Sequence, residues 1–92
     1  MYRALVCCRA GMGSSMLLKI KADQVISENH FDIKTEHGNL ESLRGYNGDL
    51  VITMEDLMNE IKDQVPYAVG IRNIVDKEEI KTKLLEFLES KK

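Results

Sequence analysis

The chain has 92 residues, with 13 lysines and arginines against 15 aspartates and glutamates, a formal net charge of −2. Because a domain usually takes about 100 to 200 residues, this length predicts a single domain over residues 1–92. The charge balance argues against nucleic-acid binding, which needs a basic surface. No apolar run approaches the roughly 18 residues that span a bilayer, and no secretion signal opens the chain. We therefore expect a cytoplasmic protein without direct membrane insertion.

The two cysteines, Cys7 and Cys8, are adjacent. A disulfide between neighbours would close no useful loop and would need unusual geometry. The two histidines, His30 and His37, lie far from them in the sequence, so no zinc-ligand spacing can be assembled. A thiol that carries out chemistry remains possible.

The first half of the chain predicts a strand, a helix and an edge strand. An apolar run over residues 2–7 stops at the glycine-bearing stretch RAGMGSS, as a strand stops at a turn. Helical spacing follows from 14 to about 29. The apolar face of this helix consists of Leu18, Ala22, Val25 and Ile26. Residues 31–36 alternate between apolar and polar, which suits an edge strand with one wet face, and a short helix is expected over 39–44.

The second half predicts two further strands, each followed by a helix. The unbroken apolar run of residues 50–52 is typical of a strand that is covered on both faces, in the middle of a parallel sheet. A helix over about 54–63 ends before Pro66, and a strand over 67–71 follows. Asp76, three residues before Glu79, resembles a capping pair and opens a last helix that runs almost to the end.

Strands that alternate with helices predict an α/β fold with right-handed crossovers and helices on both faces. With the second strand at an edge, the natural layout is a four-stranded parallel sheet of order 2-1-3-4, a flavodoxin-like or Rossmann-like arrangement. In such folds ligands bind beyond the carboxyl ends of the strands, where the strand order reverses. That position is the loop that begins at Cys8.

The loop after Cys8 has the composition of an anion-binding turn. It consists of Arg9, Ala10, Gly11, Met12, Gly13, Ser14 and Ser15. Glycines allow close approach of the backbone, and the first amides of the following helix point outward with a positive dipole. This arrangement would hold a phosphate and would stabilise a thiolate, since helix N-termini lower cysteine pKa values from about 8.5 to roughly 3.5–7.5. We therefore expect Cys8 to accept a phosphoryl group.

Other interpretations of these residues stay open. Cys8 could be a small apolar residue that ends a buried strand, although Cys7 suits that role better because adjacent strand residues face opposite sides. A low-molecular-weight phosphatase would place an arginine where Ser14 stands. Arg72, after the last strand, could face a phosphate or a partner, or could be an ordinary loop charge. His30 and His37 are expected to be solvated turn residues.

The string LVCCRAGMGSSMLLK, residues 5–19, resembles the active-site segment of IIB components of the bacterial phosphoenolpyruvate-dependent sugar phosphotransferase system (PTS). The segments IKADQ, residues 20–24, and YAVGIRNIVDKEEI, residues 67–80, look most like the ascorbate-type branch. Mannitol-type IIB domains share a similar cysteine and AGMGSS segment, and galactitol-type domains are looser relatives.

This resemblance implies that Cys8 takes a phosphoryl group from a histidine of a IIA phosphocarrier protein and passes it to a sugar at the membrane IIC permease. The loop from Arg9 to Ser15 would hold the phosphate, and no metal or organic cofactor is implied. The chain would then be a phosphotransferase of sugar transport. The alternatives are a regulatory IIB-like module that senses phosphorylation and a phosphatase-like protein.

Overall fold

The computed structural model describes residues 2–7, 13–38, 46 and 48–91. Four strands and three helices follow one another in these residues: β1 (Tyr2–Val6), α1 (Gly13–Asn29), β2 (Ile33–His37), β3 (Leu50–Met54), α2 (Glu55–Ile61), β4 (Ala68–Ile71) and α3 (Lys77–Ser90). The short helix that was expected over residues 39–44 lies outside the described residues.

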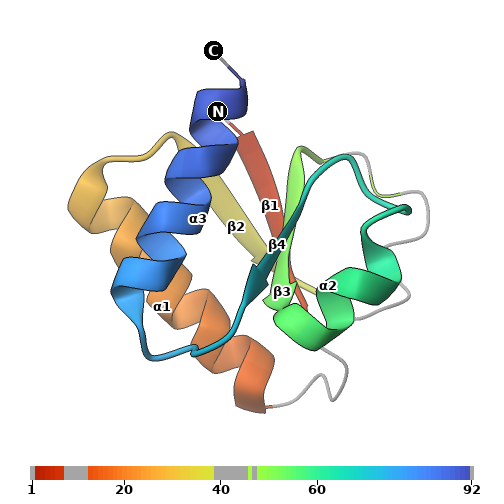
Figure 1. Ribbon diagram of the computed structural model, residues 1–92. Helices are drawn as coiled ribbons and strands as arrows, with labels where there is room; N and C mark the ends of the chain where they lie inside the picture. The colour runs from red at the N-terminus through yellow and green to blue at the C-terminus, as the bar shows by residue number, and fades with distance from the viewer. Residues whose placement is uncertain (1, 8–12, 39–45, 47, 92) are drawn as a thin grey trace.

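The four strands form one parallel sheet in the order β2-β1-β3-β4, as predicted (Figure 1). β2 lies at the edge, and β3 lies between β1 and β4. In the register, Val6 pairs with His37 on one side and with Ile52 on the other, while Met54 pairs with Ile71. The strand order reverses between β1 and β3, and this is where parallel sheets of this kind bind ligands.

Helices cover both faces of the sheet, because successive strand residues point to opposite sides. In β3, Leu50 and Ile52 belong to a buried cluster with α1 and α3, whereas Val51 belongs to a second buried cluster with α2. The larger cluster consists of Ala4, Val6, Leu18, Ala22, Val25, Ile33, Leu50, Ile52, Val69, Ile71, Ile80, Leu84 and Phe87. The smaller cluster consists of Leu5, Cys7, Val51, Leu57, Ile61 and Val65.

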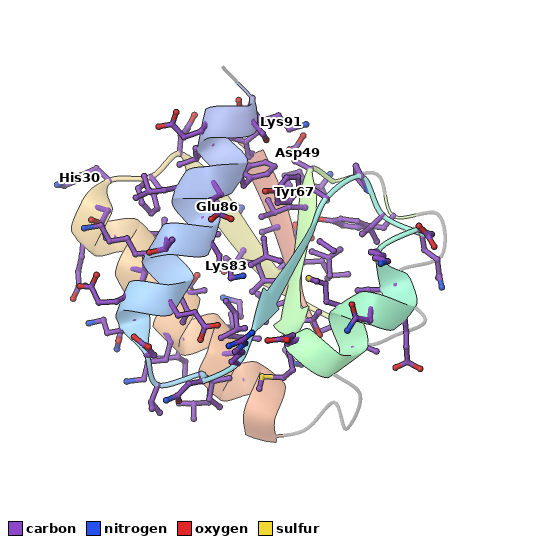
Figure 2. All side chains as sticks on the ribbon, viewed as in Figure 1. His30, Asp49, Tyr67, Lys83, Glu86 and Lys91 are labelled. Atoms are coloured by element: carbon purple, nitrogen blue, oxygen red, sulfur yellow. The ribbon has the colours of Figure 1, made fainter. Side chains whose placement is uncertain are left out.

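An aromatic group closes the larger cluster at the amino ends of the strands. The fully buried ring of Phe87 makes T-shaped contacts with the rings of Tyr2 and Tyr67, at centroid distances of 5.1 and 5.0 Å. Such edge-to-face pairs contribute about 0.5–1.5 kcal/mol each beyond their buried area. Figure 2 shows Tyr67 beside α3 at this end of the molecule. The aromatic residues therefore stabilise the end opposite to the expected site.

Several element boundaries differ from the predicted ones by one or two residues. β2 begins at Ile33 and not at residue 31, because α1 ends in a left-handed turn at His30 (φ 55°), whose successor Phe31 donates its N–H to the Ile26 carbonyl at 3.0 Å. A left-handed residue followed by this hydrogen bond is the Schellman motif, which commonly ends helices. Glycine usually takes the left-handed position, and here it is histidine. The predicted start of the second helix was also early, since Met54 is still paired in β3.

Candidate functional site at the carboxyl edge of the sheet

The carboxyl ends of the strands and the starts of the helices lie at one edge of the sheet. Figure 1 shows the strand arrows pointing toward the same edge at which α1 and α2 begin. α1 begins at Gly13, only six residues after Cys7, and its first turn contains no acidic residue. At about 1.5 Å per residue its 17 residues form a helix of roughly 25 Å, whose positive end lies at this edge.

Of the two neighbouring cysteines, the structure describes Cys7. Cys7 is fully buried in the cluster under α2 and donates its N–H to the Ile52 carbonyl at 3.1 Å. It is a core residue, as the sequence indicated. Of the predicted phosphate loop, Cys8, Arg9, Ala10, Gly11 and Met12 lie outside the described residues. Gly13, Ser14 and Ser15 are the first three residues of α1.

A pocket of about 500 Å³ opens at this edge, at the ends of β3 and β4. The lining residues that the structure describes are Met54, Glu55, Asn59, Ile71 and Arg72. Met54 and Ile71 are the paired last residues of their strands, and Glu55 begins α2 directly after β3. The pocket therefore combines an apolar base, formed by the strand ends, with a charged rim from α2 and the β4–α3 loop.

Arg72 on this rim is held by two carboxylates from different helices. Its Nε donates to Glu55 Oε2 at 2.5 Å, and its backbone N–H donates to Glu79 Oε2 at 2.9 Å. The hydrogen bond to Glu55, together with the negative charge of Glu55, raises the pKa of the guanidinium above its ordinary value. The Arg72 side chain is nevertheless 79% exposed. A fixed and solvent-facing cation thus stands at the pocket mouth.

Glu79 has a different role from the predicted one. Asp76 caps α3 as expected, since its carboxylate accepts the N–H groups of Glu78 and Glu79 at 3.1 and 3.3 Å. In a capping box Glu79 would bind the N–H of the capping residue. Here its two oxygens instead accept the N–H groups of Arg72 and Asn73, at 2.9 and 3.0 Å. The loop after β4 is thereby fastened to the first turn of α3.

A buried hydroxyl near the edge has no partner among the residues that the structure describes. Thr53 of β3 is fully buried, and its Oγ1 makes no hydrogen bond there. It directly follows Ile52, the residue that pairs with Val6. Leaving a buried hydroxyl unsatisfied costs about 1–3 kcal/mol. No pattern in the sequence indicated either this hydroxyl or the pairing of Glu55 with Arg72.

The two histidines are exposed, and they lie in different places. His30 directly follows α1, far from the carboxyl edge, as Figure 2 shows, and is a turn residue as predicted. His37 is the last residue of β2 rather than a turn residue, and pairs with Val6. Within the described ranges no three histidine, cysteine or acidic side chains gather as metal ligands. Of the helices described, none is both long and apolar enough to cross a membrane.

Comparison with known proteins agrees with this fold and places most of the chain in one family. A family model described as "PTS system, Lactose/Cellobiose specific IIB subunit" matches residues 3–86. An ascorbate-specific PTS system EIIB component from Mycoplasma pneumoniae is 31% identical over 87 residues, covering 91% of this chain and 92% of the relative. One of the same name from Salmonella typhimurium is 33% identical over 91 residues, covering 94% of this chain and 88% of the relative.

A solved structure shares the architecture at low identity. The lactose-specific IIB component domain of the phosphoenolpyruvate:carbohydrate phosphotransferase system from Streptococcus pneumoniae superposes with a TM-score of 0.62. The two chains are 19% identical, and the match covers 96% of this chain and 95% of the other. This likeness supports the flavodoxin-like fold. The family match over residues 3–86 shows that the chain belongs to the PTS IIB family, whose members are phosphotransferases.

Proposed function

We propose that this chain is the cysteine-phosphorylated relay of a sugar phosphotransferase system. In the first step the Cys8 thiolate attacks the phosphoryl group of a phosphohistidine on a IIA protein. The S–P bond forms as the N–P bond breaks, and the donor imidazole keeps the electron pair. In the second step a sugar hydroxyl at the membrane IIC component attacks the phosphorus and releases its proton; the O–P bond forms as the S–P bond breaks, and Cys8 leaves as the thiolate.

One observation carries this proposal: a family match that spans the sheet edge where β1 ends and α1 begins. The loop from Arg9 to Ser15 joins these elements at the point where the strand order reverses. We propose that its amides, with those of the first turn of α1, bind the phosphoryl group. A helix N-terminus favours both the phosphate and the thiolate by its unpaired N–H groups and its dipole.

The described part of the edge supports transfer rather than hydrolysis. A phosphatase of the cysteine class needs an arginine late in the loop to clamp the phosphate bidentately, and Ser14 stands at that position. Among the lining residues that the structure describes, the neighbouring pocket has Glu55 and no aspartate that could act as a general acid. We expect no measurable hydrolysis of an aryl phosphate.

We further propose ascorbate as the sugar and the cytoplasmic side of the membrane as the place of action. The relatives that are 31% and 33% identical are named ascorbate-specific, and each matches more than nine tenths of this chain. The family model carries a lactose and cellobiose description, so these sugars are the competitors to be compared. In such a relay the IIC component contacts the sugar.

The test uses purified chain, candidate phospho-IIA proteins and membrane vesicles that contain one IIC component each. We expect the chain to accept phosphate from an ascorbate-type IIA and to pass it on only with ascorbate and an ascorbate-type IIC. Acceptance followed by transfer to lactose or cellobiose would overturn the sugar assignment. Failure to accept phosphate from any IIA protein would overturn the relay itself.

A further inference from the structure

Arg72 occupies a place at the carboxyl edge that the proposed relay leaves without a role. It is the first residue after β4, on the wall of the 500 Å³ pocket. β4 is separated from β1 only by β3. Neighbouring strands are about 4.8 Å apart, so the end of β1 lies roughly 10 Å from the end of β4. A long side chain at the end of β4 can therefore approach a group that is held just beyond β1.

The two carboxylates that hold Arg72 leave part of its guanidinium available. Glu55 accepts a hydrogen bond from Nε of Arg72, and Glu79 accepts one only from the backbone N–H of Arg72. Among the residues that the structure describes, neither terminal nitrogen, Nη1 or Nη2, has a hydrogen-bond partner. Nη1 and Nη2 can donate two parallel hydrogen bonds to two oxygens of one phosphoryl group. Because the side chain is already held, less rotamer entropy is lost when an anion binds.

Stability alone does not explain this arrangement. The Glu55–Arg72 pair is exposed at both ends, with 44% and 79% of the two side chains accessible. Exposed pairs of this kind add little to folding stability, because solvent and salt screen their charges. Removal of the Arg72 charge should therefore leave the fold intact.

We propose that Arg72 is a further catalytic residue, which contacts the transferring phosphoryl group with its two terminal nitrogens; this inference rests on the proposed relay at Cys8. As the S–P bond forms and the donor N–P bond breaks, negative charge is carried by the three equatorial oxygens of phosphorus. The guanidinium stabilises that charge, with no proton transferred to or from it. Glu55 and Glu79 act as positioning residues, which hold the side chain and the backbone of Arg72.

The test compares Arg72→Gln with a matched control, Arg3→Gln. Arg3 is also exposed and also paired with a glutamate, Glu36, at 3.5 Å. It lies near the amino end of β1, about 16 Å of extended chain from residue 8, where salt screens its charge. Arg72→Lys is the third variant, because it keeps the charge but loses the planar fork. Thermal melting of each variant checks that it is folded.

The first readout is the single-turnover rate of phosphoryl transfer from phospho-IIA to each variant. Because charge-assisted hydrogen bonds are among the stronger ones, we expect their loss in Arg72→Gln to slow transfer by at least about tenfold. Arg72→Lys should fall between Arg72→Gln and the wild type, and Arg3→Gln should match the wild type. Rates that are equal in Arg72→Gln and Arg3→Gln would overturn the proposal.

The second readout is the ³¹P NMR titration of the phosphorylated chain, which a merely structural role of Arg72 would not move. A nearby cation favours the doubly charged phosphoryl group, so Arg72→Gln should move the titration midpoint upward by at least about half a pH unit. An unmoved midpoint would show that Arg72 does not touch the phosphoryl group, even if transfer is slow. If the wild type accepts no phosphate, the relay itself fails, and this inference fails with it.

Discussion

Helix α2 packs so closely on the sheet at Gly70 that a single methyl group should disturb it. A Cβ placed on Gly70 would lie 2.7 Å from Met58 Sδ and 3.1 Å from both Met58 Cβ and Glu55 Cα. The methionine sulfur can move, but the Glu55 Cα is backbone and can only yield if the first turn of α2 shifts. Gly70→Ala therefore tests how closely α2, which begins at Glu55, packs on the sheet.

The expected change in the free energy of unfolding is the cost of overpacking minus the gain from a less flexible unfolded chain. Overpacking of a core costs typically 1–3 kcal/mol, and replacing glycine by alanine returns about 0.4–1 kcal/mol by restricting the unfolded chain. We expect Gly70→Ala to lower the free energy of unfolding by roughly 1–2 kcal/mol, or the melting temperature by about 5–15 °C in a domain of this size. Urea titration and calorimetry measure the two quantities.

A double-mutant cycle with Met58→Ala separates the sulfur contact from the other two. Truncation of Met58 removes its sulfur but leaves the contacts with its Cβ and with the Glu55 backbone. Met58→Ala should therefore lower the free energy of unfolding less in the Gly70→Ala protein than in the wild type. It should not restore the full stability of the wild type. A Gly70→Ala protein as stable as the wild type would refute the close approach of α2. Complete rescue by Met58→Ala would refute the backbone contact.

Three further changes test separate parts of the structure. Thr53→Val should raise the free energy of unfolding by about 1 kcal/mol, because it removes a buried hydroxyl without a described partner, and an unchanged or lower value in urea titration would contradict this. Asp76→Ala should lower it by about 1 kcal/mol through loss of the cap on α3, whereas Asp76→Asn should restore most of the loss. Burial raises the pKa of Tyr46, partly opposed by Arg3, so Tyr46 should ionise after an ordinary tyrosine in an absorbance titration. Since the unfolded chain then loses this proton first, stability should fall as the pH rises above about 10, and Tyr46→Phe should weaken that fall.

The order of elements and the buried faces could be predicted because they follow from local periodicity. Leu18, Ala22 and Val25 recur at helical spacing and are all buried against the sheet. The apolar run that begins at Leu50 lies in the interior of the sheet, as unbroken runs do in parallel sheets. The start of β2 could not be predicted, since nothing in the sequence showed that His30 takes a left-handed conformation.

The site could be predicted only in part, because its described contacts join residues that are distant in sequence. Arg72 and Glu55 are 17 positions apart, and Glu79 leaves its expected local partner for the backbone of the β4–α3 loop. Such pairings depend on how α2 and α3 are placed on the sheet. Cys7 could be assigned to the core because strand residues alternate, and the structure confirms it. The role of Cys8 stays a prediction.

Identification of the phosphorylated cysteine tests the central claim most directly. The wild type, Cys8→Ser and Cys7→Ala are each incubated with phospho-IIA, and the modified peptide is located by mass spectrometry; alanine at position 7 avoids leaving a hydroxyl in the core. We expect the phosphoryl group on Cys8 in the wild type and in Cys7→Ala, and none on Cys8→Ser. Phosphate on Cys7, on a histidine, or still present in Cys8→Ser would contradict the proposed relay.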